Sequence, residues 1–368
     1  MDGVPVWLLG LPVDPVSLDE ACTRIADAGA SGRRLFFATP NLNFLRLARG
    51  DAAFTRSVLR CELSLADGVP LLWLARGLGV ALPERVAGSS VVERLRSAVR
   101  GRPLGVCFFG GAPGVGERAR AALDAEGGGL RGAGAVDPGF CSLDEMSSAQ
   151  MIDAVNETDA DLLVVALGAR NGHLWLDRNR DRLTIPVASH LGAVVNFVAG
   201  TVARAPEVWQ RLGLEWLWRI RQEPALASRY LRDGVFLLAE IAGALPRILV
   251  GRALRRLRAQ GRDGLHIERN APGTLRPVGA LTAMTVPALL ADLEAGAERY
   301  GAANDKGADV VQVIDLSGVD DLDAVGIGLL YAAAFRRSPG CELRSPSPAA
   351  LRLLRLHRAE ILLTGPAR

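Results

Sequence analysis

Residues 35–68 constrain the fold of this chain more than any other stretch. An apolar run, Leu35–Ala38, ends in Thr39-Pro40-Asn41; an amphipathic segment follows, and a second apolar run, residues 63–66, ends in Asp67-Gly68. Strand, polar tip, helix, strand and polar tip is the layout of an open α/β sheet, which binds ligands at the carboxyl ends of its strands. We therefore expect Thr39 and Asn41 to lie beside Asp67 on one edge of a sheet.

Four further apolar runs alternate with amphipathic segments: Val6–Leu9, Gly105–Phe109, Asp161–Leu167 and Thr184–Ser189. This alternation predicts an α/β fold with a Rossmann-like, mostly parallel sheet over residues 1–204. Ser17, followed three residues later by Glu20, has capping-box spacing and predicts the start of a helix.

Beyond the predicted sheet the pattern changes. Residues 205–262 contain no strand pattern and predict a helical appendage. Residues 263–273 are interpreted as a linker, and residues 274–368 as a second, smaller α/β domain.

Composition excludes several classes of protein. The apolar fraction of 49% and charged fraction of 23% are ordinary for a folded globular protein. Five cysteines lie far apart without a CxxC pair, which argues against a disulfide framework or a zinc site and fits a reducing cytoplasm. The N-terminus does not resemble a signal peptide. The longest apolar run, Val235–Val250, is interrupted by Glu240 and Pro246 and is shorter than the roughly 20 residues of a membrane span, so we expect no transmembrane helix.

Asp67 is the strongest candidate for a catalytic residue. An attacking hydroxyl needs a base to accept its proton, and a carboxylate at an exposed strand tip can do this. The alternative is an ordinary Asp-Gly turn.

Residues 110–116 are rich in glycine, follow a strand and open a helix. Their backbone N–H groups, including those of Gly110 and Gly111, can therefore face a phosphate. They match neither the dinucleotide fingerprint nor a Walker loop, and a plain strand-to-helix turn is the alternative. His173 and His190 fall near strand ends and are candidate phosphate contacts or proton donors; structural histidines are the alternative.

The segment 209–262 combines three tryptophans within ten residues, Trp209, Trp216 and Trp218, with a later arginine cluster. Helices that lie in a membrane interface combine such aromatic faces with arginines that meet anionic lipid. A helical hairpin packed on the sheet or on another subunit is the alternative. Nucleic acid is not an expected partner, because the basic cluster lacks a recognition motif.

Seven blocks of sequence, in family order over roughly residues 5–245, resemble the signature of the WecG/TagA/CpsF glycosyltransferases. They are Thr39-Pro40-Asn41, Ala66-Asp67-Gly68, Arg85-Val86-Ala87-Gly88-Ser89, Phe109–Gly114, Leu167-Gly168-Ala169, Ala199–Pro206 and Leu212–Pro224.

The resemblance implies an inverting transferase that moves an N-acetylmannosamine-type sugar from a UDP-sugar to a polyprenyl-diphosphate-linked glycan. It implies no metal and no cofactor, and a cytoplasmic enzyme bound peripherally to the inner face of the membrane. Members associate with one another, so homo-oligomers are a further expectation. Carried over by position, Asp67 is the general base and Thr39 and Asn41 line the substrate site. The remaining implied substrate-binding residues are Arg85, Gly88, Gly110, Gly111, Gly168, Asn196, Arg204, Arg219 and Arg221.

The chain departs from the family pattern in the expected donor pocket. Gly172 and His173 stand where glutamine and glutamate are usual, and Asn196 stands where aspartate is usual. Because Asp67 is kept, we interpret these changes as a different sugar donor. Two alternatives stay open: a catalytically inactive sugar-nucleotide sensor, and, more weakly, a Rossmann oxidoreductase, against which the absent dinucleotide fingerprint counts.

Residues 274–368 resemble a STAS domain, the fold of anti-sigma-factor antagonists. The blocks that carry this resemblance are Val310–Asp320, Leu322–Gly328 and Ser347–Leu354. In switching members a serine of the loop is phosphorylated, but here Ala324 and Val325 occupy the two serine positions, so a switch by added charge is not expected. The resemblance therefore implies a domain that docks a protein partner.

Overall fold

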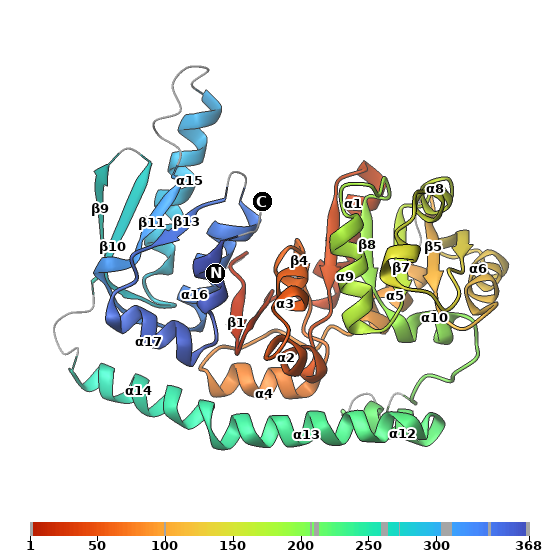
Figure 1. Ribbon diagram of the computed structural model, residues 1–368, viewed down its shortest axis with the longest axis horizontal. Coiled ribbons are helices and arrows are strands. Elements are labelled where there is room, and N and C mark those ends of the chain that lie inside the picture. The colour runs from red at the N-terminus through yellow and green to blue at the C-terminus, as the bar shows by residue number, and fades with distance from the viewer. Residues whose placement is uncertain are drawn as a thin grey trace. The chain divides into compact units, whose positions relative to one another are not determined.

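The computed structural model describes residues 3–98, 101–206, 208–209, 213–258, 264–271, 273–302, 311–337 and 340–365. These residues form two compact units (Figure 1). The large unit comprises residues 16–72 and 83–236, and the small unit comprises residues 1–15, 73–82 and 237–368.

The large unit is built on a six-stranded sheet in which every pairing is parallel. The strand order is β4-β3-β8-β7-β5-β6. The strands are β3 (Leu35–Ala38), β4 (Leu63–Ser64), β5 (Leu104–Gly110), β6 (Leu130–Val136), β7 (Leu162–Ala166) and β8 (Val187–His190). The predicted α/β fold with a mostly parallel sheet is confirmed.

Helices cover both faces of this sheet because its apolar strands alternate their side chains. Leu35 and Phe37 join a core with helices on one face, whereas Phe36 joins a second core on the other. The first face carries α1 (Leu18–Ser31), α5 (Gly88–Ser97), α6 (Val115–Glu126) and α10 (Gly192–Val198). The second carries α8 (Ala149–Asn156) and α9 (Ala169–Asn179). Ser17 caps α1 as predicted, its hydroxyl accepting the Glu20 N–H at 3.2 Å.

Shorter helices connect these elements: α2 (Leu42–Ala48), α3 (Ala52–Leu59), α7 (Leu143–Met146) and α12 (Glu215–Gln222). The strand β6 escaped the sequence analysis because glycines interrupt its pattern. A Cβ on Gly132 would lie 2.4 Å from the Arg120 carbonyl oxygen, and one on Gly134 would lie 2.3 Å from Thr158 Cγ2. Glycine in this strand therefore marks close packing against neighbouring chain.

The small unit contains a second sheet with the order β12-β10-β11-β13, and β9 pairs antiparallel with β10. Its strands are β9 (His266–Ala271), β10 (Thr274–Leu281), β11 (Val313–Asp315), β12 (Val319–Leu322) and β13 (Glu342–Arg344). Its helices include α4 (Val69–Gly77, shared with the large unit), α14 (Ala244–Arg258), α15 (Val286–Ala302), α16 (Ala324–Tyr331) and α17 (Pro348–Leu356). The strand β9 lies within residues 263–273, so part of the predicted linker is paired in the sheet.

The N-terminal strand does not belong to the parallel sheet, and that prediction is wrong. β1 (Val6–Leu8) pairs antiparallel with β2 (Leu11–Val13). Leu9 and Gly10 both have positive φ, 44° and 117°, which suits the two-residue turn of a hairpin. The hairpin packs on α16 within the small unit, where Trp7 lies 6.0 Å from the Tyr331 ring and donates its indole N–H to the His357 carbonyl.

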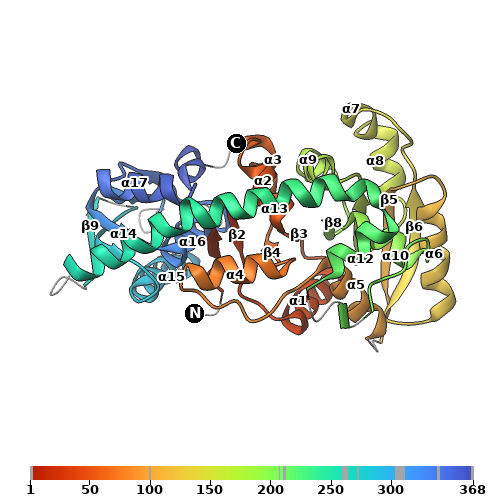
Figure 2. The same cartoon turned by 90° about the horizontal axis from the view of Figure 1, so that it is seen from below.

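Helices α13 (Ala227–Ala242) and α14 follow one another closely (Figure 2). Together with the preceding turn they make a helical stretch, Pro224–Gly251, that is long and apolar enough to cross a membrane by length and composition, and most of it is not buried. Length and composition alone do not make this stretch a membrane span, so the expectation of no transmembrane helix stays a prediction. Pro246 does not end the stretch because it stands in the first turn of α14, where its missing N–H costs no helical hydrogen bond.

Candidate active site

Asp67 and the tip of β3 lie side by side at the carboxyl edge of the large unit's sheet. β4 pairs with β3 through Ala38 and Ser64, and beyond this pair the Leu65 N–H donates to the Ala38 carbonyl at 2.8 Å. The Asp67 N–H then donates to the Pro40 carbonyl, also at 2.8 Å. The predicted neighbourhood of Asp67 with Thr39 and Asn41 is confirmed.

Thr39 and Asn41 shape this edge. Asn41 caps α2, its side-chain oxygen accepting the Phe44 N–H at 3.2 Å. Thr39 is buried, and a Cβ on Gly88 would lie 3.4 Å from its methyl group and 2.5 Å from Leu191. Glycine at the start of α5 therefore lets this helix pack closely against the residues that follow β3 and β8.

The Asp67 carboxylate sits among charged groups from distant parts of the chain. Burial raises its pKa to about 6; Arg85, Arg219 and Arg204 oppose this rise, and Glu215 adds to it. No side chain in the described residues donates a hydrogen bond to the carboxylate. The pKa of this carboxyl thus lies close to neutral pH, as the pKa of an efficient general base does.

The surrounding charges are partly paired with one another. Arg85 bridges to Glu215 at 3.0 Å. Arg204 donates to the Ser90 hydroxyl at 2.8 Å and pairs with Glu93, and burial lowers the pKa of the Arg204 guanidinium.

Two of these arginines keep unused donors. The Nε atoms of Arg204 and Arg219 are buried, and neither has a hydrogen-bond partner among the described residues. A buried cationic donor without an acceptor is costly, and an anion such as a phosphate group satisfies it. The site can therefore hold a negatively charged ligand next to Asp67.

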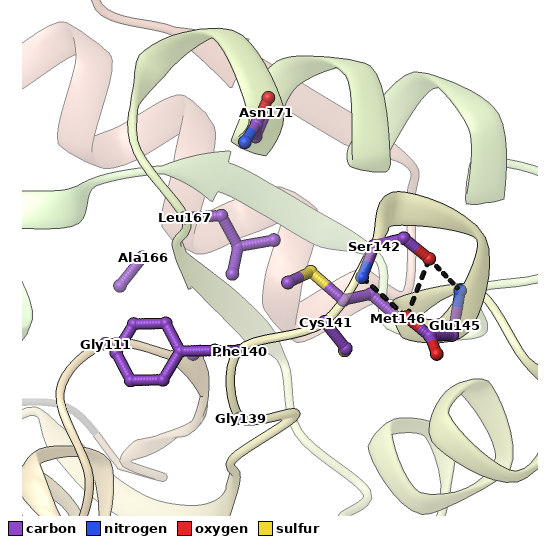
Figure 3. A pocket seen from close by; sticks show the side chains of 11 residues that line it. Gly111, Gly139, Phe140, Cys141, Ser142, Glu145, Met146, Ala166, Leu167 and Asn171 are labelled. Atoms are coloured by element: carbon purple, nitrogen blue, oxygen red, sulfur yellow. Dashed lines mark hydrogen bonds between the residues drawn. The ribbon is translucent and has the colours of Figure 1, made fainter.

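A pocket of about 570 Å³ opens elsewhere on the same edge, between the ends of β5 and β7 (Figure 3). It is lined by Gly110, Gly111, Gly139, Phe140, Cys141, Ser142, Glu145, Met146, Ala166, Leu167 and Asn171. The chain leaves β5 toward β6 on one side and leaves β7 toward β8 on the other, so the pocket lies at a topological switch point, the usual ligand site of an open α/β sheet. The predicted positions Gly110 and Gly111 line it, both with positive φ.

His173 and His190 lie together in the interior of the large unit, with ring centroids 5.9 Å apart. Burial lowers the pKa of His173 to about 3 and that of His190 to about 4, so both imidazoles are uncharged at neutral pH. His173 packs edge-on against Phe44 and Phe54, at 5.2 and 5.9 Å. A proton-donor role at neutral pH is not supported by these surroundings.

The His190 ring explains why position 172 is a glycine. A Cβ at this position would lie 2.3 Å from Cδ2 of His190. The imidazole thus fills the space that a side chain at position 172 would need, and the departure from the family pattern at Gly172 goes together with His190.

The other predicted site residues are spread along the edge. Gly168 precedes α9 with φ 77°, and Asn196 lies in α10, its carbonyl accepting the Thr201 N–H at 3.0 Å. Arg221 is exposed on α12 and is not among the charges that act on Asp67. Within the described residues no group of three or more His, Cys, Asp or Glu side chains is placed to hold a metal ion.

Glu215 was missed as a functional residue. It lies in the block Leu212–Pro224, about 150 residues after Asp67 in the sequence. Nothing in its local sequence shows that α12 packs close to Asp67. The loop that carries Phe140 at the pocket was not predicted, because residues 120–160 have no clear sequence pattern.

Residues 6–248, well over half of the 368-residue chain, match the model of the glycosyl transferase WecG/TagA/CpsF family. The chain therefore belongs to the WecG/TagA/CpsF family of glycosyltransferases. Membership makes it a transferase of cell-surface polysaccharide synthesis that uses a sugar nucleotide and a glycan acceptor. Members are typically membrane-associated.

Proposed function

We propose that this family member is an inverting transferase that moves an N-acetylmannosamine-type or related sugar from a UDP-sugar to a polyprenyl-diphosphate-linked acceptor. The observation that carries the proposal is the Asp67 carboxylate, with its pKa near 6, among arginines that keep unused donors.

In the proposed step Asp67 accepts the proton of the acceptor hydroxyl. The hydroxyl oxygen forms a bond to the anomeric carbon while the bond from that carbon to the UDP oxygen breaks on the opposite face. UDP leaves with the bonding electron pair. A single displacement of this kind inverts the anomeric centre and needs one base, which agrees with one carboxylate of raised pKa at the site.

Arginines take the role of stabilising the leaving group. Arg204 and Arg219 have buried Nε donors without partners among the described residues. Arg85 is the charged residue with the largest effect on the pKa of Asp67. Donors fixed in place where charge develops stabilise a transition state more than mobile water does. We therefore propose that transfer needs no metal, and that chelation with EDTA leaves the rate unchanged.

The helices α12–α14 support binding to the inner face of the cytoplasmic membrane. Leu231, Val235 and Leu238 recur at helical spacing and point outward on one face of α13. The large apolar side chains that are at least 40% exposed on these helices are Trp216, Leu217, Leu231, Val235, Leu238, Ile241, Leu249 and Val250. Flotation with anionic liposomes tests this proposal: Leu231→Ser with Leu238→Ser should abolish binding, and full retention would overturn it.

For residues 274–368 we keep the proposal of a STAS-type domain that docks a protein partner. The parallel strands of its sheet and the helix α16 after β12 support it. Ala324 and Val325 are buried, and a Cβ on Gly328 would lie 1.7 Å from the Pro5 carbonyl oxygen, so the chain's own N-terminal segment covers α16. A docked partner would therefore use another face. An experimental structure with a different strand order in this sheet would overturn the assignment.

The alternative, an inactive sugar-nucleotide sensor, is favoured by one observation: His190 fills the space beside Gly172, where the family carries a glutamine. The intact Asp67 cluster favours the enzyme.

The decisive experiment compares wild type with Asp67→Asn in UDP release from UDP-sugars, in the presence of a polyprenyl-diphosphate-linked acceptor. Loss of a general base should slow transfer by about 10²- to 10⁴-fold. Binding of UDP, measured by thermal shift, should persist, because an amide keeps the size of the carboxylate. A wild type that binds UDP-sugar but transfers nothing, or an Asp67→Asn variant as active as wild type, would favour the sensor.

A further inference from the structure

The C-terminal segment does not make up the small unit by itself. Residues 1–15, 73–82 and 237–368 cluster together, so the unit also contains the N-terminal hairpin and the last residues of α13. The apolar side chains of the hairpin are at most 2% exposed; they are Val6, Trp7, Leu8, Leu9, Leu11 and Val13. The small unit is therefore assembled from separate segments of the chain, and contacts between these segments hold it together.

Two successive residues, His357 and Arg358, contact both the hairpin and α13. The His357 carbonyl accepts the indole N–H of Trp7 at 2.9 Å. One nitrogen of the Arg358 guanidinium donates to both carboxylate oxygens of Glu240, near the end of α13, at 2.7 and 2.8 Å. A Cβ on Gly10, in the turn of the hairpin, would lie 3.9 Å from the Arg358 Cβ. The hairpin and α13 thus meet the C-terminal segment at one place.

The backbone of Arg358 is strained at this place. Its φ is 59°, in the left-handed region that residues other than glycine rarely adopt. Such a conformation persists only where the surrounding structure fixes it. The strain therefore indicates that the contacts with the hairpin and with α13 determine the position of Arg358.

The small unit buries one face of the helices α13 and α14 and leaves another face exposed. Glu240 is 1% exposed and Ile248 is also buried. By contrast, Leu238, Ile241 and Leu249 are exposed on the same helices. Exposed apolar side chains that gather on one surface mark a site of interaction with a protein or a membrane. The small unit thus holds these helices by the face opposite to their apolar surface.

We propose that the small unit is an internal anchor, in which Arg358 fixes the end of α13 so that the apolar face of α13 and α14 meets the membrane. A buried carboxylate that loses its guanidinium partner is strongly unfavourable, so the end of α13 would leave its place without Arg358. A helix that is ordered before it meets the bilayer loses less conformational entropy on binding. Arg358 is thus a positioning residue. The inference rests on the membrane binding proposed above and gives the small unit a role in it.

The test compares the full-length wild type with Arg358→Met, in which a long side chain carries no charge. Hydrogen exchange of residues 237–251 should become at least about tenfold faster in the variant, because the end of α13 opens more often. Binding to vesicles of phosphatidylcholine and phosphatidylglycerol, measured by flotation, should weaken by about tenfold. The affinity for UDP should stay within about twofold of wild type, because Asp67 and the arginines around it lie in the large unit.

Three further variants serve as controls. Glu240→Gln combined with Arg358→Met removes both buried charges and should recover most of the exchange protection and of the flotation. Arg355→Met removes the same charge from an exposed pair with Glu360 and should leave both measurements within about twofold of wild type. Arg336→Met breaks the buried pair with Asp14, which does not involve α13, and should change flotation less than Arg358→Met does.

Three outcomes would overturn the inference. Unchanged exchange of residues 237–251 in Arg358→Met would show that the ion pair does not hold α13. A loss of flotation in Arg336→Met as large as that in Arg358→Met would show that only the overall stability of the small unit matters. Absence of recovery in the double variant would show that Arg358 does not act through Glu240. If wild type itself does not float, the proposed membrane binding fails, and the exchange rates alone decide whether Arg358 anchors α13.

Discussion

The large and small units each contain an aspartate close to arginines, but only the aspartate of the small unit forms a hydrogen-bonded ion pair with one of them. In the small unit Asp14 is 4% exposed, and both of its carboxylate oxygens accept hydrogen bonds from Arg336, one at 2.8 Å. Arg336 in turn donates to the Tyr331 hydroxyl at 3.0 Å and lies over the Tyr331 ring. In the large unit Asp67 has charges around it, but no side chain of the part of the chain that the structure describes donates a hydrogen bond to its carboxylate.

The difference separates a structural ion pair from a reactive group. A buried carboxylate whose two oxygens both accept hydrogen bonds from one guanidinium is committed to that ion pair, which fixes its position. The pair ties the segment at Asp14, just after β2, to the π-helical turn Ala332–Arg336 that follows α16. The ion pair of Arg358 with Glu240 ties α13 to the C-terminal segment in the same way. Burial raises the pKa of Asp67 to about 6, and the nearby arginines only partly oppose this rise.

The same substitution should therefore change stability in opposite directions at the two sites. Asp14→Asn leaves the Arg336 charge buried without its partner and should lower the free energy of unfolding by about 3–5 kcal/mol. Asp67→Asn should raise it at pH 7 by about 1–2 kcal/mol, since half-burial limits the effect.

The sign at Asp67 follows from proton linkage. Its pKa in the folded state, about 6, exceeds the usual value near 4 of an unfolded chain, so the folded state binds the proton more tightly. Its contribution to stability falls as the pH rises from about 4 to 6 and stays low above that range. Urea denaturation at pH 5 and pH 7.5 measures both variants, and hydrogen exchange assigns each change to its unit. An Asp67→Asn variant as destabilised as Asp14→Asn would mean that Asp67 is a structural group.

The neighbourhood of Asp67 with Thr39 and Asn41 was predictable from sequence because the carboxyl ends of parallel strands meet at one edge whatever the strand order. The pocket was not, because it depends on β5 and β7 being neighbours with connections that leave in opposite directions. Glu215 and Arg204 reach Asp67 only through the path of the chain after α10. The hairpin β1–β2 was missed because Leu9, rather than a turn-forming residue, adopts positive φ.

His173 and His190 offer a test inside the large unit. They are buried and packed, as Asp14 is, and we therefore expect them to stabilise the fold rather than to react. Gly172→Ala should lower the free energy of unfolding by about 1–3 kcal/mol, because the new methyl group would overlap the His190 ring. The double variant with His190→Ala should recover part of that loss.

Gly234→Ala is the matched control for this prediction. Gly234 also lies within a helix, but a Cβ there meets nothing within 4 Å. The substitution should therefore stabilise the protein by up to about 1 kcal/mol. If Gly172→Ala behaved like Gly234→Ala, His190 would be free to move away, and the two histidines would belong with the reactive groups after all.

The smallest expected effect is a shift in the pH dependence of transfer. This shift measures how the charges around Asp67 change its pKa. A general base acts only when ionised, so kcat/KM should fall below a pH of about 6. Arg85 lowers the pKa of Asp67 and Glu215 raises it. Arg85→Gln should therefore move the acidic limb to higher pH, and Glu215→Gln should move it to lower pH, each by about one unit or less.

Arg221→Gln is the matched control for this pair, because Arg221 is exposed on the same helix as Glu215 and does not act on Asp67. Its limb should stay at the wild-type position. Absolute rates will also fall in Arg85→Gln if that residue contacts phosphate, but the midpoint of the limb depends only on the group that titrates. Opposite shifts would identify that group as Asp67, because Arg85 lowers the pKa of this carboxyl and Glu215 raises it. Shifts in one direction, or none, would mean that another group limits the rate at low pH, and the contrast between Asp67 and the paired Asp14 would no longer be a contrast between catalysis and structure.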